Sequence, residues 1–214
     1  MKPLPRPRTY HHGDLRRALL DTVVAHVAER GNAGEVTLRE IARLAGVSHN
    51  APYRHFPDKQ AILAEVAAEG FGLLSASLRK ARESAATPED RFVKSGVAYL
   101  QFAETHPGHL AVMFGPEIAK SQTRELQMRA NETFTTLTEL AIDAGAAPGV
   151  EARRIGTVVW SLVHGLAVLA QHKQIPGSVS ETPTGLAELG MRQLFGSMQR
   201  PAEKRPRPNS RSNR

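Results

Sequence analysis

The chain has 214 residues, of which 41% are hydrophobic and only 5% aromatic, and it contains no cysteine. This length is sufficient for one or two small domains with a substantial buried core. The absence of cysteine excludes a disulfide scaffold, a zinc finger and a thiol nucleophile. It also fits a reducing cytoplasm, where we expect the protein to reside.

The formal net charge of +7 is concentrated at the two ends of the chain. Residues 1–17 hold five Lys or Arg against one acidic residue, and residues 200–214 hold six against one, so the remainder is slightly acidic. Both ends are rich in proline and lack apolar periodicity, which predicts a flexible basic arm at residues 1–12 and a disordered basic tail at residues 200–214. Such arms either attract phosphates or only keep the chain soluble. The N-terminus lacks the apolar region of a signal peptide.

Residues 13–30 form the first predicted helix. Its apolar side chains recur at four-residue steps and share one face, formed by Leu15, Leu19, Val23 and Val27. Gly31 is expected to end this helix, because glycine adopts the left-handed backbone of a helix C-terminus at little steric cost.

A helix, a tight turn and a second short helix are predicted between residues 37 and 59. Thr37 and Glu40 have the spacing of a capping box, which marks the start of the first of these helices. Gly46 follows its last apolar residue, and Ser48 is placed to cap the second helix. Two helices joined by a short glycine-containing turn form a helix-turn-helix, whose second helix can enter the major groove of DNA.

The same segment resembles the DNA-binding domain of TetR-type (tetracycline-repressor-like) transcriptional regulators. The matching positions are Thr37, Ile41, Ala42, Ala45, Gly46, Val47, Ser48, Tyr53, Phe56 and Lys59. The resemblance runs from about Asp14 to Leu74, and it implies a DNA-binding regulator. Pro52 departs from the family pattern, in which an unbranched or apolar residue is more usual at this position. A proline beyond the start of a helix removes a hydrogen bond and strains the turn.

Side chains of the second short helix are the expected DNA contacts. Asn50 and Arg54 are candidate base readers, because asparagine pairs with adenine and arginine with guanine through two hydrogen bonds each. The resemblance implies phosphate contacts from Tyr53, although this ring could equally pack in the core. The resemblance also implies phosphate contacts from Thr37, His55 and Lys59, which is reasonable near helix N-termini. Ser48 and His49 complete the expected DNA surface.

The remainder of the chain is predicted to be entirely helical. Pro57 and Asp58 stop the second short helix and cap a longer one, and the domain boundary is expected near residue 60. This gives a helix-turn-helix domain at residues 13–60 and a helical ligand-binding and dimerisation domain at residues 61–199. Further helices are predicted at 88–105, 108–115, 117–144, 149–173 and 183–199. The fold class is therefore all-α, with about nine helices.

The last two predicted helices carry apolar residues over an unusually wide arc. The run 155–170 is shorter than the roughly 20 apolar residues of a membrane span, so no membrane association is expected. A helix this apolar must be buried on two sides, either within one core or against a second subunit. The resemblance implies a four-helix contact between two subunits. Its candidate residues are Ile155, Val158, Leu162, Leu166, Leu169, Met191, Leu194, Phe195 and Met198.

Aromatic and methionine side chains between residues 99 and 164 are candidates for a ligand pocket. The proposed lining is Tyr99, Phe102, Met113, Phe114, Met128, Phe134 and Trp160, with His164 as a polar anchor. A fully packed core is the alternative. The segment WSLVHGLA resembles the C-terminal domain of a TetR subgroup that is marked by a Trp-x-x-x-His-Gly signature.

Together these patterns predict a ligand-responsive transcriptional repressor that binds a palindromic DNA operator as a homodimer. Its effector would be a small molecule whose identity the sequence does not specify. The histidine pairs lack the spacing of metal ligands, and no nucleophile–base pair or cofactor loop is present, so neither a metal, a cofactor nor an enzyme is expected. The alternative is an architectural DNA-binding protein without a specific operator.

Overall fold

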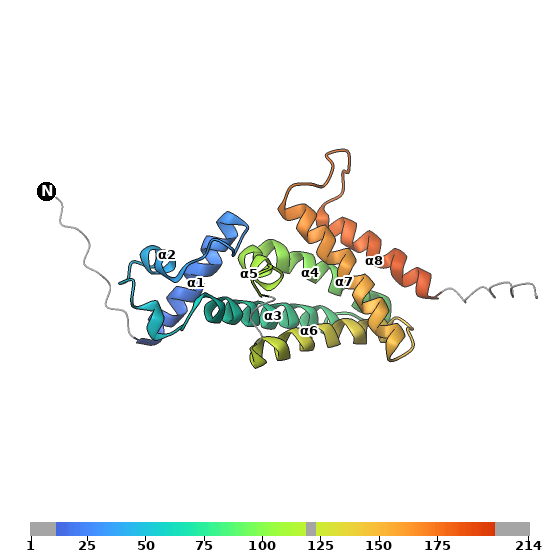
Figure 1. Ribbon diagram of the computed structural model, residues 1–214. Helices are drawn as coiled ribbons and strands as arrows, with labels where there is room; N and C mark the ends of the chain where they lie inside the picture. The colour runs from blue at the N-terminus through green and yellow to red at the C-terminus, as the bar shows by residue number, and fades with distance from the viewer. Residues whose placement is uncertain (1–11, 119–122, 200–214) are drawn as a thin grey trace, which may run out of the picture.

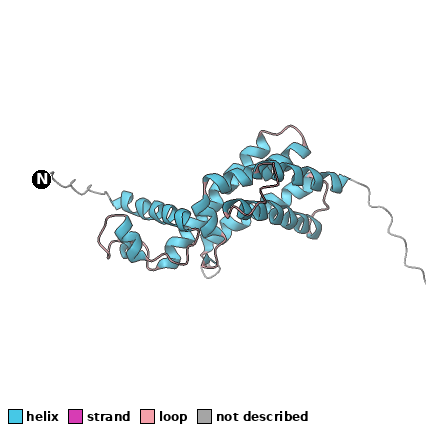
Figure 2. Cartoon of the chain, turned by 90° about the horizontal axis from the view of Figure 1, so that it is seen from above, coloured by secondary structure: helices cyan, strands magenta, loops and turns pink. Residues whose placement is uncertain are grey.

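The computed structural model describes residues 12–118 and 123–199, and the predictions for the basic arm and tail lie outside these residues, except at His12. The described elements are all helical, which confirms the predicted all-α class (Figures 1 and 2). They are α1 (His12–Arg30), α2 (Leu38–Leu44), the short 3-10 helix η1 (Pro52–Arg54), α3 (Lys59–Glu83), α4 (Pro88–Thr105), α5 (Pro107–Met113), α6 (Arg124–Asp143), α7 (Val150–Gln171) and α8 (Pro183–Gln199).

Side-chain caps fix most of the predicted helix starts. The Asp58 carboxylate accepts a hydrogen bond from the Ala61 N–H at 2.8 Å, and the Thr87 hydroxyl accepts one from Asp90 N–H at 3.0 Å. The predicted start of α6 at residue 117 is wrong. Thr123 caps this helix instead, because its hydroxyl accepts from the Leu126 N–H at 3.3 Å.

The turn after α2 has the geometry that the glycine predicts. Gly46 has φ +68°, and its N–H donates to the Arg43 carbonyl at 3.2 Å. The Val47 N–H reaches back to the Ala42 carbonyl at 3.0 Å. These two bonds form a Schellman motif, which satisfies carbonyls that the helix itself leaves free. The next segment therefore leaves α2 at a sharp angle.

Helices α1 and α2 and the η1 segment form one end of an elongated molecule, and α3 runs from this end into the helical body (Figure 1). The proposed domain boundary near residue 60 falls in the first turn of α3. One buried apolar cluster extends from Leu19 and Phe56 at the head, along α3, to Leu140 and Val163 in the body. The two regions are thus packed together through α3.

Helix α5 fills the joint between the head and the body. A Cβ atom added at Gly108 would lie 2.2 Å from the Val24 carbonyl oxygen, so the backbones of α5 and α1 are in direct contact. On the other side of α5, a Cβ at Gly70 of α3 would lie 2.5 Å from the Met113 sulfur. Because interiors are close-packed, a displacement of α5 must also displace one of its two neighbours.

Helix α7 buries only one of its faces within the protomer. Val159, Val163 and Ala167 point into the core, whereas Val158 is 50% and Leu169 41% exposed. By length and composition alone, α3 and α7 could each cross a membrane. The short apolar run at residues 155–170 therefore does not by itself exclude a membrane-spanning helix. In α3, 61% of the apolar window is buried in the protein, which is typical of a core helix, whereas in α7 only 22% is buried.

Candidate DNA-binding and effector sites

The predicted second helix of the helix-turn-helix is a turn followed by a single turn of 3-10 helix. In an α-helix the Ser48 carbonyl would accept from residue 52, but Pro52 has no N–H to donate. The Ala51 N–H donates to that carbonyl instead, at 2.9 Å, and the same i to i+3 pattern continues from His55 to the Pro52 carbonyl at 2.9 Å. We call residues Ser48–His55 the recognition segment.

Most polar side chains of the recognition segment are exposed. Ser48, His49, Asn50 and Arg54 lie on the surface, and Tyr53 is 49% exposed, so its ring does not belong to the core. Among the described residues, no hydrogen bond or ion pair engages the side chains of Asn50 or Arg54. Both are therefore free to bind a partner.

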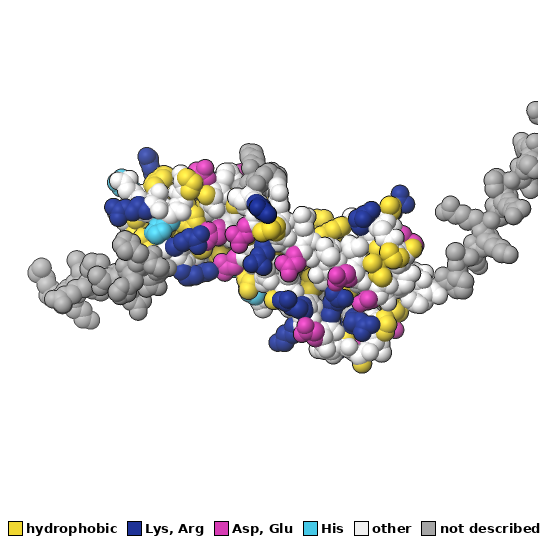
Figure 3. Space-filling view, turned by 90° about the horizontal axis from the view of Figure 1, so that it is seen from below, with side chains coloured by type: hydrophobic (Ala, Val, Ile, Leu, Met, Phe, Trp, Pro, Cys, Tyr) yellow, Lys and Arg dark blue, Asp and Glu magenta, His cyan; other side chains and the backbone are white. Residues whose placement is uncertain are grey.

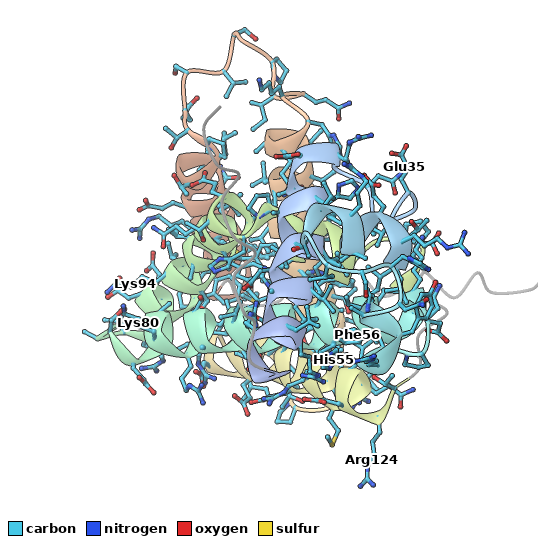
Figure 4. All side chains as sticks on the ribbon, turned by 90° about the vertical axis from the view of Figure 1, so that its left-hand side faces the viewer. Glu35, His55, Phe56, Lys80, Lys94 and Arg124 are labelled. Carbon is cyan, nitrogen blue, oxygen red and sulfur yellow. The ribbon has the colours of Figure 1, made fainter. Side chains whose placement is uncertain are left out.

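Phe56, the residue that follows the recognition segment, is buried and faces inward. Phe56 is 2% exposed and lies beneath the Arg16 guanidinium, 5.6 Å from the ring centre. The half-buried His55 ring lies 6.5 Å from Phe56, and Figure 4 looks onto this end of the molecule. Phe56 thus anchors the segment, while its neighbours remain accessible.

Two expected phosphate contacts are engaged within the protein. The Thr37 hydroxyl accepts from the Glu40 N–H at 3.1 Å, and the Glu40 carboxylate pairs with Arg43, so only half of the capping box forms. The Lys59 ammonium donates to the Gly34 carbonyl at 2.6 Å and lies 3.8 Å from Glu117. These contacts tie the start of α3 to the loop before α2. Phosphate binding by these residues stays a prediction.

The surface charge around the head is largely compensated. Arg16 pairs with Glu65 at 2.5 Å, and Arg17 pairs with Glu69 at 2.8 Å, across the α1–α3 contact. The underside of the molecule shows acidic side chains interspersed with basic ones rather than a continuous basic band (Figure 3). Exposed arginines without an ion pair to a described residue, such as Arg54, therefore remain available to DNA phosphates or bases.

A cavity of about 230 Å³ lies among α3, α4, α6 and α7, and we call it the apolar cavity. Its lining is Phe71, Leu74, Leu78, Tyr99, Phe114, Ala130, Asn131, Thr133, Phe134, Leu137 and Trp160. Four of these residues, Tyr99, Phe114, Phe134 and Trp160, were predicted from the sequence. The contribution of α3 was missed, as were the α6 residues other than Phe134, because their apolar residues have the same periodicity as ordinary core residues.

Three predicted pocket residues lie elsewhere. Phe102 is buried in the core and stacks on His106 at 5.0 Å, and Met113 is buried against Gly70. Met128 is 55% exposed on α6. None of the three lines the apolar cavity, because the helical wheel does not show which neighbouring helix each side chain meets.

His164 lies beside the apolar cavity rather than in its lining. Its Nδ1 atom and the Tyr99 hydroxyl are 2.8 Å apart, and its ring centre is 4.5 Å from that of Phe114. Burial lowers the pKa of His164 and raises the pKa of Tyr99, because both charged forms would lose hydration. The pair is therefore neutral at neutral pH.

A second cavity, of about 490 Å³, separates the C-terminal end of α1 from α5 and α7. Arg30 and Gly31 line it from the head, and Phe114 and His164 line it from the body. Phe114 thus forms part of the wall of both cavities. Its position connects the interior of the body to the joint with the head.

The predicted dimer residues differ in accessibility. Met191 is fully buried against Gly96 in the same protomer, so it is not available to a second subunit. Leu162 packs within the protomer too, because a Cβ at Gly190 would lie 3.0 Å from its side chain. Val158 and Leu169 are exposed, and the partly buried members of the set are Ile155, Leu162, Leu166, Leu194, Phe195 and Met198.

The sequence matches two families over separate regions. Residues 20–66 match bacterial regulatory proteins of the tetR family, and residues 92–194 match the tetracyclin repressor-like C-terminal domain. The first match covers the helix-turn-helix and the start of α3. The second covers most of the helical body, including the described residues around Tyr99, Trp160 and His164.

Individual relatives agree with these matches. The HTH-type transcriptional regulator BetI of Rhizobium meliloti is 28% identical over 81% of this chain and 85% of its own length. The HTH-type transcriptional repressor KstR2 of Rhodococcus jostii is 30% identical over 65% of this chain and 64% of its own. A solved structure of a protein of unknown function from Rhodococcus sp. RHA1 is 31% identical, with a TM-score of 0.74 over 89% of this chain and 98% of that one. The chain belongs to the TetR family of DNA-binding transcriptional regulators and is not an enzyme.

Proposed function

We propose that the protein is a homodimeric repressor, which binds a palindromic operator in the cytoplasm and is released from it by a small molecule. The observation that carries this proposal is the recognition segment, where Asn50, Tyr53 and Arg54 are exposed on a rigid base formed by Phe56. Phosphate contacts position a protein on DNA, and side chains at base edges supply specificity. A relative that is named a transcriptional repressor supports repression rather than activation.

The exposed apolar face of α7 supports the homodimer. Val158 and Leu169 lie on this face, and the half-exposed Leu189 lies on the adjacent helix α8. An apolar surface of this kind typically marks an interaction site. A second copy of the same face would cover it and would place two recognition segments for two half-sites about one helical turn (~34 Å) apart.

The apolar cavity supports control by a ligand. Phe114 borders this cavity, and the preceding helix α5 touches the α1 backbone at Gly108. A ligand that shifts Phe114 can thus move the head, provided that it binds the free and the DNA-bound states with different affinity. The Trp160, His164 and Gly165 signature belongs to this same region and supports our assignment to a subgroup that carries it.

Footprinting on the DNA that flanks the gene, with excess competitor DNA, tests the function. A regulator protects one palindromic site under these conditions, because specific binding exceeds non-specific binding by about 10³-fold or more. An architectural protein would lose its protection as competitor is added. That outcome would overturn the operator-specific function.

A further inference from the structure

The size of the apolar cavity limits its occupant to a small molecule. An engineered apolar cavity of about 150 Å³ in another protein binds benzene. The cavity here measures about 230 Å³, so it has space for one aromatic ring with a short substituent. A flexible long-chain ligand would extend beyond this space, past the exposed Asn131 at its border.

The electrostatics of the cavity favour an uncharged molecule. The described lining contains no Asp, Glu, Lys, Arg or His. The adjoining Tyr99–His164 pair is neutral, and its 2.8 Å hydrogen bond is satisfied within the protein. An ion that entered would lose its hydration without gaining a countercharge, which is strongly unfavourable.

The Trp160 indole N–H interacts with the Tyr99 hydroxyl, so one other polar group of the described lining is available to a ligand. The Thr133 hydroxyl is buried and already bonded to Ser75 at 2.8 Å. The Asn131 side chain is exposed, borders the cavity and makes no hydrogen bond to another described residue. Its amide can donate to a carbonyl or accept from a hydroxyl.

Aromatic rings line one side of the cavity and favour a ring in the ligand. The Phe114 ring centre lies 5.7 Å from Phe71 in an edge-to-face arrangement and 5.6 Å from Trp160 in a tilted one. Ring pairs at these separations attract one another beyond the burial of their area.

We infer that the effector is an uncharged, ring-containing molecule with a single carbonyl or hydroxyl group, which lies in the apolar cavity and bonds to Asn131. This inference rests on the proposed effector function. It narrows the ligand to small neutral ketones, alcohols or amides, and it excludes carboxylates and cations.

Calorimetry with three probes of nearly equal size tests the ligand class. The probes are 4-phenylbutan-2-one, which is neutral, 3-phenylpropanoate, which is anionic, and trimethyl(2-phenylethyl)ammonium, which is cationic. We expect the full-length protein to bind the ketone at least about tenfold more tightly than either ion. Equal or tighter binding of the carboxylate or the ammonium ion would overturn the inference, and so would binding of none at millimolar concentration.

Variants of α6 locate the binding site. Asn131→Leu should weaken ketone binding about three- to tenfold, which corresponds to the loss of one neutral hydrogen bond. Ala130→Phe should abolish it by filling the cavity, whereas Met128→Ala, on the outer surface of the same helix, should leave it unchanged. Ketone binding that survives Ala130→Phe would place the ligand elsewhere.

Operator release separates this inference from the proposed function. If the ketone binds in the cavity but leaves operator affinity unchanged, the ligand class is upheld and the effector role fails. If the operator is bound specifically but the ions are preferred to the ketone, the regulator function is upheld and the ligand class fails.

Discussion

Single residues decide how this protein presents its DNA-reading surface. Pro52 withdraws one backbone N–H, and the recognition segment is a turn followed by one turn of 3-10 helix at Pro52–Arg54 instead of an α-helix. Asn50 lies in the turn, whereas Tyr53 and Arg54 lie in the 3-10 helix, and all three side chains are exposed.

Substitution of the two base readers should relax sequence discrimination. We expect Arg54→Ala and Asn50→Ala each to reduce the free-energy difference between the operator and a single-base mismatch by about 1–3 kcal/mol at one position. Binding to a panel of mismatched operators at fixed salt measures this effect. Arg153→Ala, an exposed arginine on α7, is the matched control. Full discrimination in both variants would contradict the assignment.

The buried His109 and the half-buried His164 should make the protein less stable in acid. Burial lowers the pKa of His109 and His164 below the ordinary 6.5. Glu69 of α3 faces His109 at 3.8 Å and opposes the shift, as does Asp21, whereas Arg17 and His106 reinforce it. The unfolded chain therefore binds more protons below pH 6.5, so the free energy of unfolding should fall as the pH drops through that value.

Urea denaturation between pH 5 and 8 measures this dependence. His109→Gln should flatten the curve relative to the wild type, because one of the two groups responsible is removed. His49→Gln, at an exposed position on the recognition segment, is the comparison. A curve for His109→Gln that parallels the wild type would show that His109 does not contribute.

At the scale of elements, α5 is the part that joins the two halves of the molecule. It touches the α1 backbone through Gly108 and α3 through Met113, and the residue after it, Phe114, borders both cavities. Helix α3 also lines the apolar cavity and continues into the head, but α5 is packed between α1 and α3 and can shift against both. We therefore place the coupling between ligand and DNA in α5.

Replacement of Gly108 by alanine should force α5 away from α1. The added Cβ would lie 2.2 Å from a backbone oxygen, which cannot rotate aside. We expect a loss of about 1–3 kcal/mol in stability, typical of overpacking, together with altered operator affinity. Gly72→Ala on α3 meets open space and should be neutral or stabilising by up to about 1 kcal/mol. Equal stability of the two variants in urea would refute the contact.

The sequence predicted helices best where the determinants are local. The spans 88–105 and 183–199 match α4 and α8, because a cap or a proline marks their starts. The recognition segment was predicted as a helix. Its 3-10 turn follows from the hydrogen bond to the Ser48 carbonyl that Pro52, without an N–H, cannot donate. The cavity was found in part, because Phe71 and Leu74 line it only through the meeting of α3 with α6, a contact between residues far apart in sequence.

At the scale of the whole molecule, the protomer is incomplete along α7. Only 22% of the apolar window of this helix is buried, against 61% in the core helix α3, and its inner face packs on α4 and α6. A stable second subunit is the covering that we propose. The partly buried residues Leu194, Phe195 and Met198 of α8 would lie at or near its edge.

A charge on the outer face of α7 should separate the subunits. In Val158→Glu or Leu169→Glu an unpaired carboxylate would be buried in the dimer at a cost of several kcal/mol, while the protomer, where both sites are exposed, should stay folded. Sedimentation at micromolar concentration should show monomers with reduced operator affinity. Met128→Glu, at an exposed site on α6, should remain dimeric. A wild-type protein that sediments as a monomer would end the proposal.

The shortness of the recognition segment has a consequence for how the protein finds its site in a genome. Two base readers, at about 1–3 kcal/mol each, discriminate by about 2–6 kcal/mol in one half-site, a factor of roughly 30 to 10⁴. A genome offers about 10⁶–10⁹ competing positions, so a single half-site carries too little information to be unique. In the proposed dimer, the base contacts in a second half-site and its distance from the first would supply the rest. That distance would be set by the subunit contact rather than by any residue that touches DNA. A change on the outer face of α7 could thereby redirect the protein to different genes without altering its recognition segment.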